Sequence, residues 1–452
     1  MKKNDIAQIE ITALTSEGSG VGRHAGMAVF VPKTAVGDVI EARIVKVLSS
    51  YAYGIIERVI KPSPDRIEND CPVFGKCGGC VYRHISYEAE LSAKERIVRD
   101  AFERIGGLSP SFLPICGSDK TERYRNKLQM PLAKTDDGMI SGFFSERTHR
   151  VIPVDDCRLQ PEIFSEIVEF IKEQCRTLKI SVYNEKAHEG VLRHIYLRRG
   201  HASGEICAVL VAKRKIPEFR KLGGELTRKF PDITGVVLNI NPERTNVILG
   251  EREITLCGKS CISDTMCGVR FEIAPKSFYQ VNTPQAEKLY AQAAEFAGIG
   301  EHSGKTLLDL YCGIGTIGLS ISDKSENLIG AEIVPEAVEN ARRNALLNGF
   351  ENAEFICADA ARAAAELAER GLRPDVIVLD PPRKGCDEDT LSACVKMLPE
   401  RIVMISCNPA TAARDCKLLA GNGYSIGKVR AFDLFPRTRH VECVVLMSHS
   451  EK

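Results

Sequence analysis

The chain has 452 residues, 44% of them apolar, and a formal net charge of +1. This length predicts two to four globular domains with sizeable cores, and the near-zero charge does not mark the whole chain as a polyanion-binding protein. No stretch approaches 18 apolar residues, which excludes a membrane-spanning helix of ordinary length. The residues after Met1 lack the apolar stretch of a signal peptide, so we expect a cytoplasmic protein without a membrane partner.

Residues 1–62 are predicted to form a small β-barrel like an oligonucleotide-binding fold. Ile9 and Ile11 alternate with polar residues, and Ile40, Ala42 and Ile44 repeat the alternation. Barrels of this size commonly bind oligonucleotides, although a fold alone does not establish a function. The Pro-Ser-Pro sequence that follows at 62–64 is typical of a linker.

Residues 63–274 are expected to form a central, β-rich domain. A helix is predicted over residues 87–104, and one clear helix over residues 161–177. Residues 191–230 contain ten Lys or Arg against three Asp or Glu, which fits a solvated face as well as an RNA-binding surface.

Residues 275–452 alternate apolar strands with helices, which predicts an α/β domain with a parallel, doubly wound sheet. The helix over residues 335–348 is one of those expected between strands. Two further strands near the end of the chain are expected to form an antiparallel pair. The predicted parallel strands are 306–310, 328–333, 354–358, 376–379 and 402–405, and the final pair is 424–431 and 440–447.

The segment Asp309–Gly318 follows the first strand and opens a helix. Its glycines match G-x-G-x-x-G, and such glycines let a backbone turn tightly and approach a ligand closely. Glu332 ends the next strand, where it can accept hydrogen bonds from ribose hydroxyls, and Asp359 ends the third strand, within reach of an adenine amino group. A nucleoside-containing cofactor is expected. The same glycines are compatible with a nicotinamide-dependent oxidoreductase, so the motif alone leaves both classes open.

Two more residues with potentially reactive side chains stand at the carboxyl ends of strands. Asp380 follows the fourth strand and Cys407 follows the fifth. Asn408 and Pro409 are typical of a helix N-cap and of the first helical position, so the Cys407 thiol is expected at the positive end of a helix dipole. That location predicts a lowered thiol pKa and a nucleophile, whereas the plainer alternative is an inert buried cysteine.

Five motifs occur together in this half of the chain. They are Phe278-Tyr-Gln280-Val-Asn282, Asp309-Leu-Tyr311-Cys-Gly313, Asp380-Pro-Pro-Arg383, Ser406-Cys407-Asn-Pro409 and His440-Val-Glu442. With them the chain resembles the RNA (uracil-5-)-methyltransferases, and most of all the branch that modifies 23S ribosomal RNA and carries an iron–sulfur cluster. The resemblance extends over nearly the whole chain, since the N-terminal barrel is similar to the TRAM domain of that family.

The resemblance implies a catalytic pair. Cys407 adds to C6 of a uridine, C5 then takes the methyl group of S-adenosylmethionine, and Glu442 removes the C5 proton so that the thiol can leave. Taken alone, Glu442 is more simply read as an ordinary strand residue. The product would be 5-methyluridine in 23S ribosomal RNA, with a tRNA T-loop uridine as the alternative substrate.

The resemblance also assigns cofactor and substrate contacts. Phe278, Gln280 and Asn282 alternate, so in a strand they would share one face. Phe278 is expected near the target base. The expected cofactor residues are Gln280, Tyr311, Gly313, Glu332, Asp359 and Asp380.

A uridine must be unstacked before its ring carbons can be reached, and RNA loops supply such bases. The N-terminal barrel and the cationic segment, with Arg193, Arg198 and Arg199, are expected to hold the flanking RNA backbone. The sequence gives no sign of an obligate protein partner.

Cys71, Cys77 and Cys80 form a C-x5-C-x2-C pattern whose glycines let the chain wrap around an inorganic centre. The resemblance supplies Cys157 as a fourth ligand, with Cys116 and Cys175 as substitutes. Four cysteines suit either zinc or a [4Fe–4S] cluster. The resemblance favours the cluster, and methyl transfer gives it a structural rather than a redox role.

A non-catalytic RNA-binding protein on a methyltransferase scaffold is a further alternative. The presence of Cys407, Glu442 and the cofactor residues disfavours it.

Overall fold

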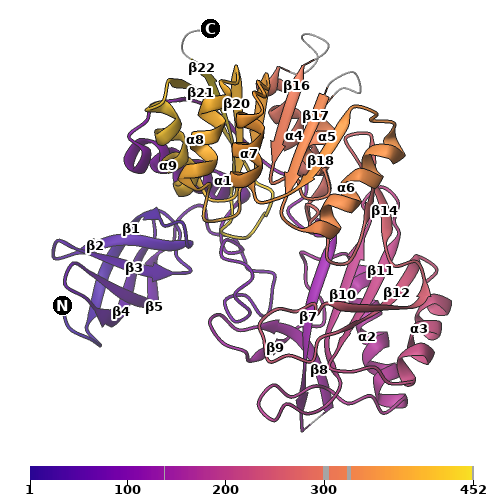
Figure 1. The fold of residues 1–452 in the computed structure, drawn as a ribbon. Coiled ribbons are helices and arrows are strands. Elements are labelled where there is room, and N and C mark those ends of the chain that lie inside the picture. Colours follow the sequence, from indigo (N-terminus) through magenta and orange to yellow (C-terminus); the bar gives the residue numbers. More distant parts are fainter. Residues whose placement is uncertain (137, 299–304, 323–326, 450–452) are drawn as a thin grey trace.

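The computed structural model describes residues 1–136, 138–298, 305–322 and 327–449. The chain folds into a small barrel, a central β-sheet domain and a larger α/β unit (Figure 1). Among the helices in the described ranges, none is long and apolar enough to cross a membrane.

The predicted N-terminal barrel is confirmed. Five strands close in the order β1-β2-β3-β5-β4 around a core that includes Ile9, Ile11, Ile40 and Ile44. The alternation seen in the sequence therefore corresponds to inward- and outward-facing sides of each strand. The strands are β1 (Ile6–Leu14), β2 (Ser19–His24), β3 (Met27–Pro32), β4 (Val39–Val47) and β5 (Tyr51–Lys61).

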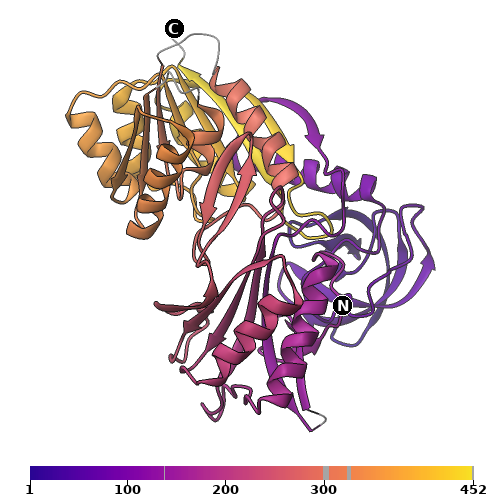
Figure 2. The same cartoon turned by 90° about the vertical axis from the view of Figure 1, so that its right-hand side faces the viewer.

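The central domain is a seven-stranded sheet in the order β13-β12-β11-β10-β7-β8-β9, with two helices packed against it (Figure 2). The strands are β7 (Lys127–Thr135), β8 (Gly138–Phe144), β9 (Val151–Pro153), β10 (Leu192–Arg199), β11 (Ile206–Ala212), β12 (Ile233–Ile240) and β13 (Arg252–Gly258). The first helix, α2 (Glu162–Thr177), was predicted from the sequence, whereas the second, α3 (Glu218–Lys229), was not. The second helix was missed because two glycines interrupt it and cations surround its apolar positions. It connects the parallel strands β11 and β12.

The third unit contains an eight-stranded sheet in the order β18-β17-β16-β19-β20-β22-β21-β6. Five neighbouring strands are parallel, and β22 runs antiparallel to both β20 and β21. The predicted fold class, a parallel sheet with a terminal antiparallel pair, is confirmed. The strands are β16 (Thr306–Leu310), β17 (Asn327–Glu332), β18 (Ala353–Cys357), β19 (Val376–Leu379), β20 (Arg401–Ser406), β21 (Tyr424–Phe432), β22 (Glu442–His449) and β6 (Ser111–Cys116).

Helices cover both faces of this sheet, because successive side chains along its strands point alternately into two apolar cores. Leu307 and Val378 contribute to one core, and Leu308 and Ile377 to the other. The first core is completed by α4 (Thr283–Ala297), α5 (Thr316–Ile321) and α6 (Pro335–Asn348), and the second by α7 (Ala360–Glu369), α8 (Glu388–Met397) and α9 (Pro409–Ala420).

The edge strand β6 comes from a part of the chain that was assigned to the central domain. It pairs in parallel with β21, and so crosses the sequence boundary expected at residue 274. The helix predicted over residues 87–104 is α1 (Tyr87–Asp100) followed by a wider turn, η1 (Ala101–Gly106), which packs against α9. A two-stranded sheet, β14 (Ile262–Met266) with β15 (Val269–Ile273), precedes α4.

Candidate active site

The carboxyl ends of the parallel strands carry several of the residues that the sequence singled out. Glu332 ends β17, Asp380 follows β19 and Cys407 follows β20. Since these strands are parallel and in register, their ends meet at one edge of the sheet, where open α/β sheets bind ligands.

Asn408 connects two of the loops at this edge. Its side-chain oxygen accepts a hydrogen bond from the backbone N–H of Ala410 at 3.2 Å, so it caps α9 as predicted. Its Nδ2 donates to the backbone carbonyl of Arg383 at 2.9 Å. The loop that carries Cys407 is therefore tied to the Asp-Pro-Pro-Arg loop.

Cys407 and Glu442 lie opposite each other. Ser406 pairs with Cys443 in the antiparallel ladder of β20 and β22, so the next residue outward on each strand is Cys407 and Glu442, respectively. Glu442 is only 5% exposed. Burial, followed by the charge of Asp380, raises the pKa of the Glu442 carboxyl to about 8, and Arg383 opposes the rise.

The thiol of Cys407 does not have the lowered pKa that sequence analysis predicted. Burial, then the charges of Glu442 and Asp380, raise the pKa of the Cys407 thiol to about 11. Arg383 and the backbone N–H of Cys407 itself act in the opposite direction but are weaker. The prediction was wrong because it considered the helix dipole without the burial of the thiol and without the two carboxylates brought in from other strands.

Asp380 and Arg383 provide the remaining charges of the site. Burial raises the pKa of the Asp380 carboxyl to about 7. The Arg383 guanidinium lies 3.3 Å from Nε2 of His440, and burial together with this charge lowers the pKa of His440 to about 4. His440 is therefore neutral at physiological pH, and Arg383 is the cation that stabilises anions around Cys407.

The glycine loop turns sharply at the end of β16. Tyr311, Gly313 and Gly315 all have positive φ, at 70°, 57° and 82°. A Cβ atom at Gly318 would lie 2.9 Å from Oδ2 of Asp309, so only glycine allows this close approach of helix and strand.

Two carboxylates support the loop. Glu332 accepts hydrogen bonds from the backbone N–H groups of Gly313 at 3.1 Å and of Val334 at 2.8 Å. Asp309, which sequence analysis did not assign to the site, accepts from the Gly318 N–H at 2.8 Å, while its Oδ1 is buried without a partner. Burial raises the pKa of the Asp309 carboxyl to about 8.

Gln280 and Tyr311 occupy different surroundings. Gln280 is buried, and its backbone carbonyl accepts a hydrogen bond from Asn126 Nδ2 at 2.8 Å. Its side chain lies beside Tyr290, whose pKa is raised by burial and by the charge of Asp380. Tyr311 lies against Cys386 and packs on the second apolar core.

Phe278 and Asp359 are more peripheral. The segment that contains Phe278 and Gln280 is irregular rather than a strand, so the expected shared face does not exist, and Phe278 is 62% exposed. Asp359 is exposed and caps α7 by accepting from the Arg362 N–H at 3.0 Å.

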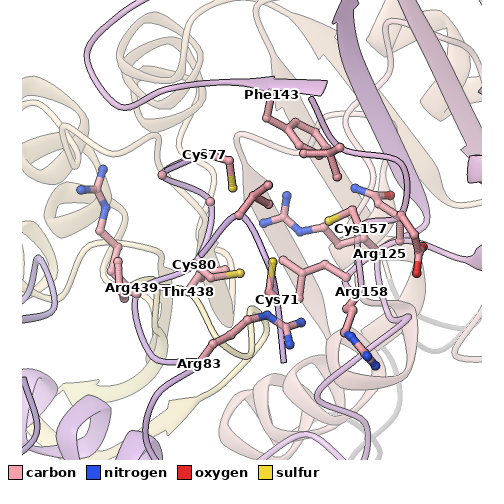
Figure 3. A pocket seen from close by; sticks show the side chains of 18 of the residues that line it. Cys71, Cys77, Cys80, Arg83, Arg125, Phe143, Cys157, Arg158, Thr438 and Arg439 are labelled. Atoms are coloured by element: carbon pink, nitrogen blue, oxygen red, sulfur yellow. The ribbon is translucent and has the colours of Figure 1, made fainter. Parts of the chain in front are cut away.

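The four predicted cysteine ligands line one cavity of about 290 Å³, and Figure 3 shows their sulfur atoms around a common space. The substitutes are elsewhere, since Cys175 lies in the core of the central domain and Cys116 beside Gln285. Within the described ranges, no three His, Cys, Asp or Glu side chains are arranged to hold a single metal ion. The cavity is lined by Cys71, Cys77, Cys80 and Cys157, and by Arg83, Arg125, Arg158 and Arg439.

This cavity adjoins the loop that leads into Glu442. Thr438, Arg439 and His440 of the loop line the cavity. The backbone N–H groups of Val81 and Tyr82, which follow the last cysteine of the motif, both donate to the Arg437 carbonyl, at 2.9 and 3.2 Å.

A buried ion cluster fixes the same loop, and no sequence pattern indicated it. Lys94 Nζ lies 2.7 Å from Glu90 Oε1 and 2.7 Å from Asp433 Oδ1, and it donates to the Phe435 carbonyl at 3.2 Å. All three charged side chains are fully buried. The only local trace of the cluster is the Glu90–Lys94 spacing of four residues on one helix, which is common on solvated helix faces as well.

Two of the arginines expected to contact RNA are used internally instead. Arg193 and Arg198 are both 3% exposed. Arg193 donates to the carbonyls of Asn241 and Glu243, and Arg198 to those of Ala274 and Ser277. These arginines cannot form the predicted phosphate contacts in this conformation, because the cationic run belongs partly to a buried strand.

The chain was compared with known proteins. The family model for tRNA (uracil-5-)-methyltransferases matches residues 86–450, and the model for the TRAM domain matches residues 2–56. An uncharacterized RNA methyltransferase of Halalkalibacterium halodurans is 42% identical over 99% of this chain and 98% of that protein. Another, from Clostridium tetani, is 39% identical over 99% of this chain and 97% of that protein.

Among solved structures, the Pyrococcus abyssi tRNA (uracil-54, C5)-methyltransferase in complex with S-adenosyl-L-homocysteine is similar, with a TM-score of 0.77. The two sequences are 29% identical, and the match covers 97% of this chain and 100% of that one. The chain belongs to the tRNA (uracil-5-)-methyltransferase family and is an RNA methyltransferase with an N-terminal TRAM domain.

Proposed function

We propose that this protein transfers a methyl group from S-adenosylmethionine to C5 of a uridine in RNA, giving 5-methyluridine. The observation that supports it most is the position of Cys407 opposite Glu442, at the edge of the sheet that also carries the glycine loop. A nucleophile and a base on adjacent strands can act on neighbouring carbons of one pyrimidine ring.

Cys407 acts first, as a thiolate that forms a bond to C6 of the uracil ring. Arg383, which opposes the rise in the thiol pKa, stabilises the thiolate. The electron pair of the C5–C6 double bond moves toward C5 and the O4 carbonyl, which makes C5 nucleophilic. S-adenosylmethionine would supply the methyl group that C5 takes up, its S–CH3 bond breaking to leave S-adenosylhomocysteine.

Glu442 acts in the second half of the reaction. As a carboxylate it removes the remaining C5 proton, the C5–C6 double bond reforms, and the Cys407–C6 bond breaks to release the thiolate. A base with a pKa of about 8 is well matched to this task at physiological pH, because it binds the proton firmly without being fully protonated beforehand.

The residues at the strand ends fit the cofactor. Glu332 is held beside the glycine loop by its bonds to backbone N–H groups, and the unpartnered Oδ1 of Asp309 is a buried acceptor under the same loop. We infer that Glu332 binds ribose hydroxyls, with Gln280, Tyr311, Gly313 and Asp380 around the rest of the ligand. Asp359 is proposed to contact the adenine, and the exposed Phe278 the target base.

We infer that the four cysteines hold a [4Fe–4S] cluster. A tetrahedral zinc site requires sulfur atoms about 3.8 Å apart, given Zn–S bonds of about 2.3 Å. The four thiols line one cavity of about 290 Å³, which has room for a centre larger than a single ion. The arginines around the cavity would balance the negative charge of a thiolate-ligated cluster. The cluster would order the cysteine segment and, through it, the loop that leads to Glu442.

We propose 23S ribosomal RNA, in the cytoplasm, as the substrate, following the four-cysteine motif. A tRNA T-loop uridine is the second candidate, favoured by the whole-chain similarity to the Pyrococcus abyssi tRNA enzyme. The nicotinamide-dependent alternative is set aside, since the family model that matches is that of a methyltransferase.

Mass mapping of methylated nucleosides in ribosomal RNA and tRNA, with and without the gene, tests the proposal. We expect one or more 5-methyluridines of 23S ribosomal RNA to disappear and to return with the wild-type gene but not with Cys407→Ala. Loss from tRNA alone would replace the ribosomal assignment, and no change in either RNA would refute the proposed reaction.

A further inference from the structure

The central domain has a second polar cavity, separate from the site at the sheet edge. It has a volume of about 430 Å³ and lies along the outer halves of β7, β8 and β10. Three exposed cations, Lys134, Arg150 and Lys186, line it, and among the lining residues in the described ranges Glu185 is the only acidic one. This charge balance predicts an anionic ligand.

Glu185 is hydrogen-bonded to His149 rather than paired with those three cations, which outnumber it. Its Oε2 lies 2.8 Å from Nδ1 of His149, so the carboxylate is already engaged by a neighbouring side chain. His149 in turn stacks on Phe144, with ring centroids 5.1 Å apart and an interplanar angle of 25°. His149 is exposed, so a flat ligand can extend the stack on its outer face.

The inner wall of the cavity carries polar atoms without partners. His194 is 7% exposed, lines the cavity, and its Nδ1 is buried without a hydrogen bond. The Nε of Arg193 is likewise unpartnered, although its Nη1 donates to two backbone carbonyls and its guanidinium stacks on Tyr183 at 4.5 Å. Buried polar groups in native proteins nearly always have partners, so these atoms point to a polar ligand.

The cavity also lies next to the cysteine site. Phe143 and Phe144 are consecutive residues of β8, and their side chains point to opposite faces of the strand. Phe143 lines the cysteine cavity and Phe144 lines this one. An RNA strand that reaches the active site past the cysteine segment can therefore continue over the end of β8 into the second cavity.

We propose that this cavity binds a nucleotide of the RNA substrate at a distance from the target uridine. The phosphate contacts Lys134, Arg150 and Lys186, the base extends the stack of Phe144 and His149, and the edge of the base or the ribose reaches His194. The inference rests on the proposed function only in taking the ligand to be RNA.

The test uses the full-length protein purified anaerobically and a fluorescein-labelled, single-stranded RNA of about 16 nucleotides that contains uridines. The triple variant K134A/R150A/K186A should raise the Kd about tenfold or more, and reduce the slope of log Kd against log salt by about 2 between about 50 and 200 mM salt. The rate of methylation at saturating RNA should not change. The control R370A/K417A/K428A removes three exposed cations of the α/β unit and should leave the Kd within about threefold of wild type.

Two further variants separate charge from stacking and guard against misfolding. K134R/R150K/K186R retains the cations and should bind as the wild type does. His149→Ala should weaken binding about fivefold or more at an unchanged salt slope, whereas His149→Phe should retain the affinity.

A wild-type Kd and slope in the first triple variant would overturn the proposal, whether or not the enzyme methylates uridine. So would a lower methylation rate at saturation with an unchanged Kd. Inorganic phosphate that binds the wild-type cavity without competing with RNA would also overturn it, since the site would then belong to a free anion. If the variants lose RNA affinity as expected but the wild type methylates no uridine, the RNA site stands and the proposed reaction fails.

Discussion

Replacing Glu442 with Gln should have opposite effects on the two halves of the reaction. Gln has nearly the same size and preserves the first position of β22, but it cannot accept the C5 proton and carries no charge. The covalent bond between Cys407 and the uracil ring should therefore form and then persist. We expect RNA-linked protein to accumulate while turnover is lost.

The structure also gives the direction and the upper limit of the change that Glu442→Gln causes in the thiolate population of Cys407. The pKa of the thiol is raised from 9.0 to about 11, and a rise of about two units corresponds to about a hundredfold less thiolate when the Glu442 carboxylate is charged. Burial is the largest cause, and the charge of Glu442 is the next. Removing that charge must increase the thiolate population, by less than about a hundredfold because burial remains.

The effect should depend on pH in a defined way. The pKa of Glu442 is about 8, so below about pH 7 the carboxyl is mostly protonated and repels no thiolate. Wild type and Glu442→Gln should then have similar thiol reactivity. Above about pH 8 the carboxylate is charged, so the wild-type thiol should become progressively less reactive than that of the variant.

Two assays test this reasoning. Alkylation of Cys407 by iodoacetamide, followed by peptide mass mapping across the pH range, measures the thiolate population, and denaturing gels with labelled RNA measure the adduct. Glu388→Gln, an exposed carboxylate at the start of α8, is the matched control and should behave as the wild type does. Slower alkylation of the variant above pH 8, or normal turnover without any adduct, would refute the reasoning.

Three other changes give further expectations. Cys407→Ala should lower the methylation rate by at least about 10³-fold without weakening S-adenosylhomocysteine binding in calorimetry, and a near-normal rate would remove this residue as the nucleophile. Lys94→Met removes the cation that the buried carboxylates of Glu90 and Asp433 share, leaving Glu90 with only its longer ion pair to Arg437 at 3.5 Å, and should lower the free energy of unfolding by about 3–5 kcal/mol in urea titrations; a loss below about 1 kcal/mol would contradict the role of this cluster. Cys157→Ser should reduce the iron content of anaerobically purified protein well below about four per chain, whereas Cys175→Ser should not, and stoichiometric zinc in the wild type would overturn the cluster assignment.

The sequence by itself determined the local elements and the residue types of the site. The alternation of apolar and polar residues specified the barrel strands, because such a strand is buried on one face. Short, continuous apolar runs specified the parallel strands, because these are buried on both faces. The Asn408-Pro409 pair defined the start of α9, since capping depends only on neighbouring residues. The cysteine spacing and the glycine loop were equally local signals.

Only the tertiary structure decided how distant segments combine. It inserted β6 at the edge of the eight-stranded sheet and placed Glu442 opposite Cys407. Burial of the thiol, followed by the charges of Glu442 and Asp380, reversed the predicted shift of the thiol pKa. The tertiary structure also turned Arg193 inward, toward backbone carbonyls that no sequence pattern identifies. Strand pairing, burial and charge proximity depend on contacts between residues far apart in the chain. A local pattern can therefore name the groups of a site without fixing their environment.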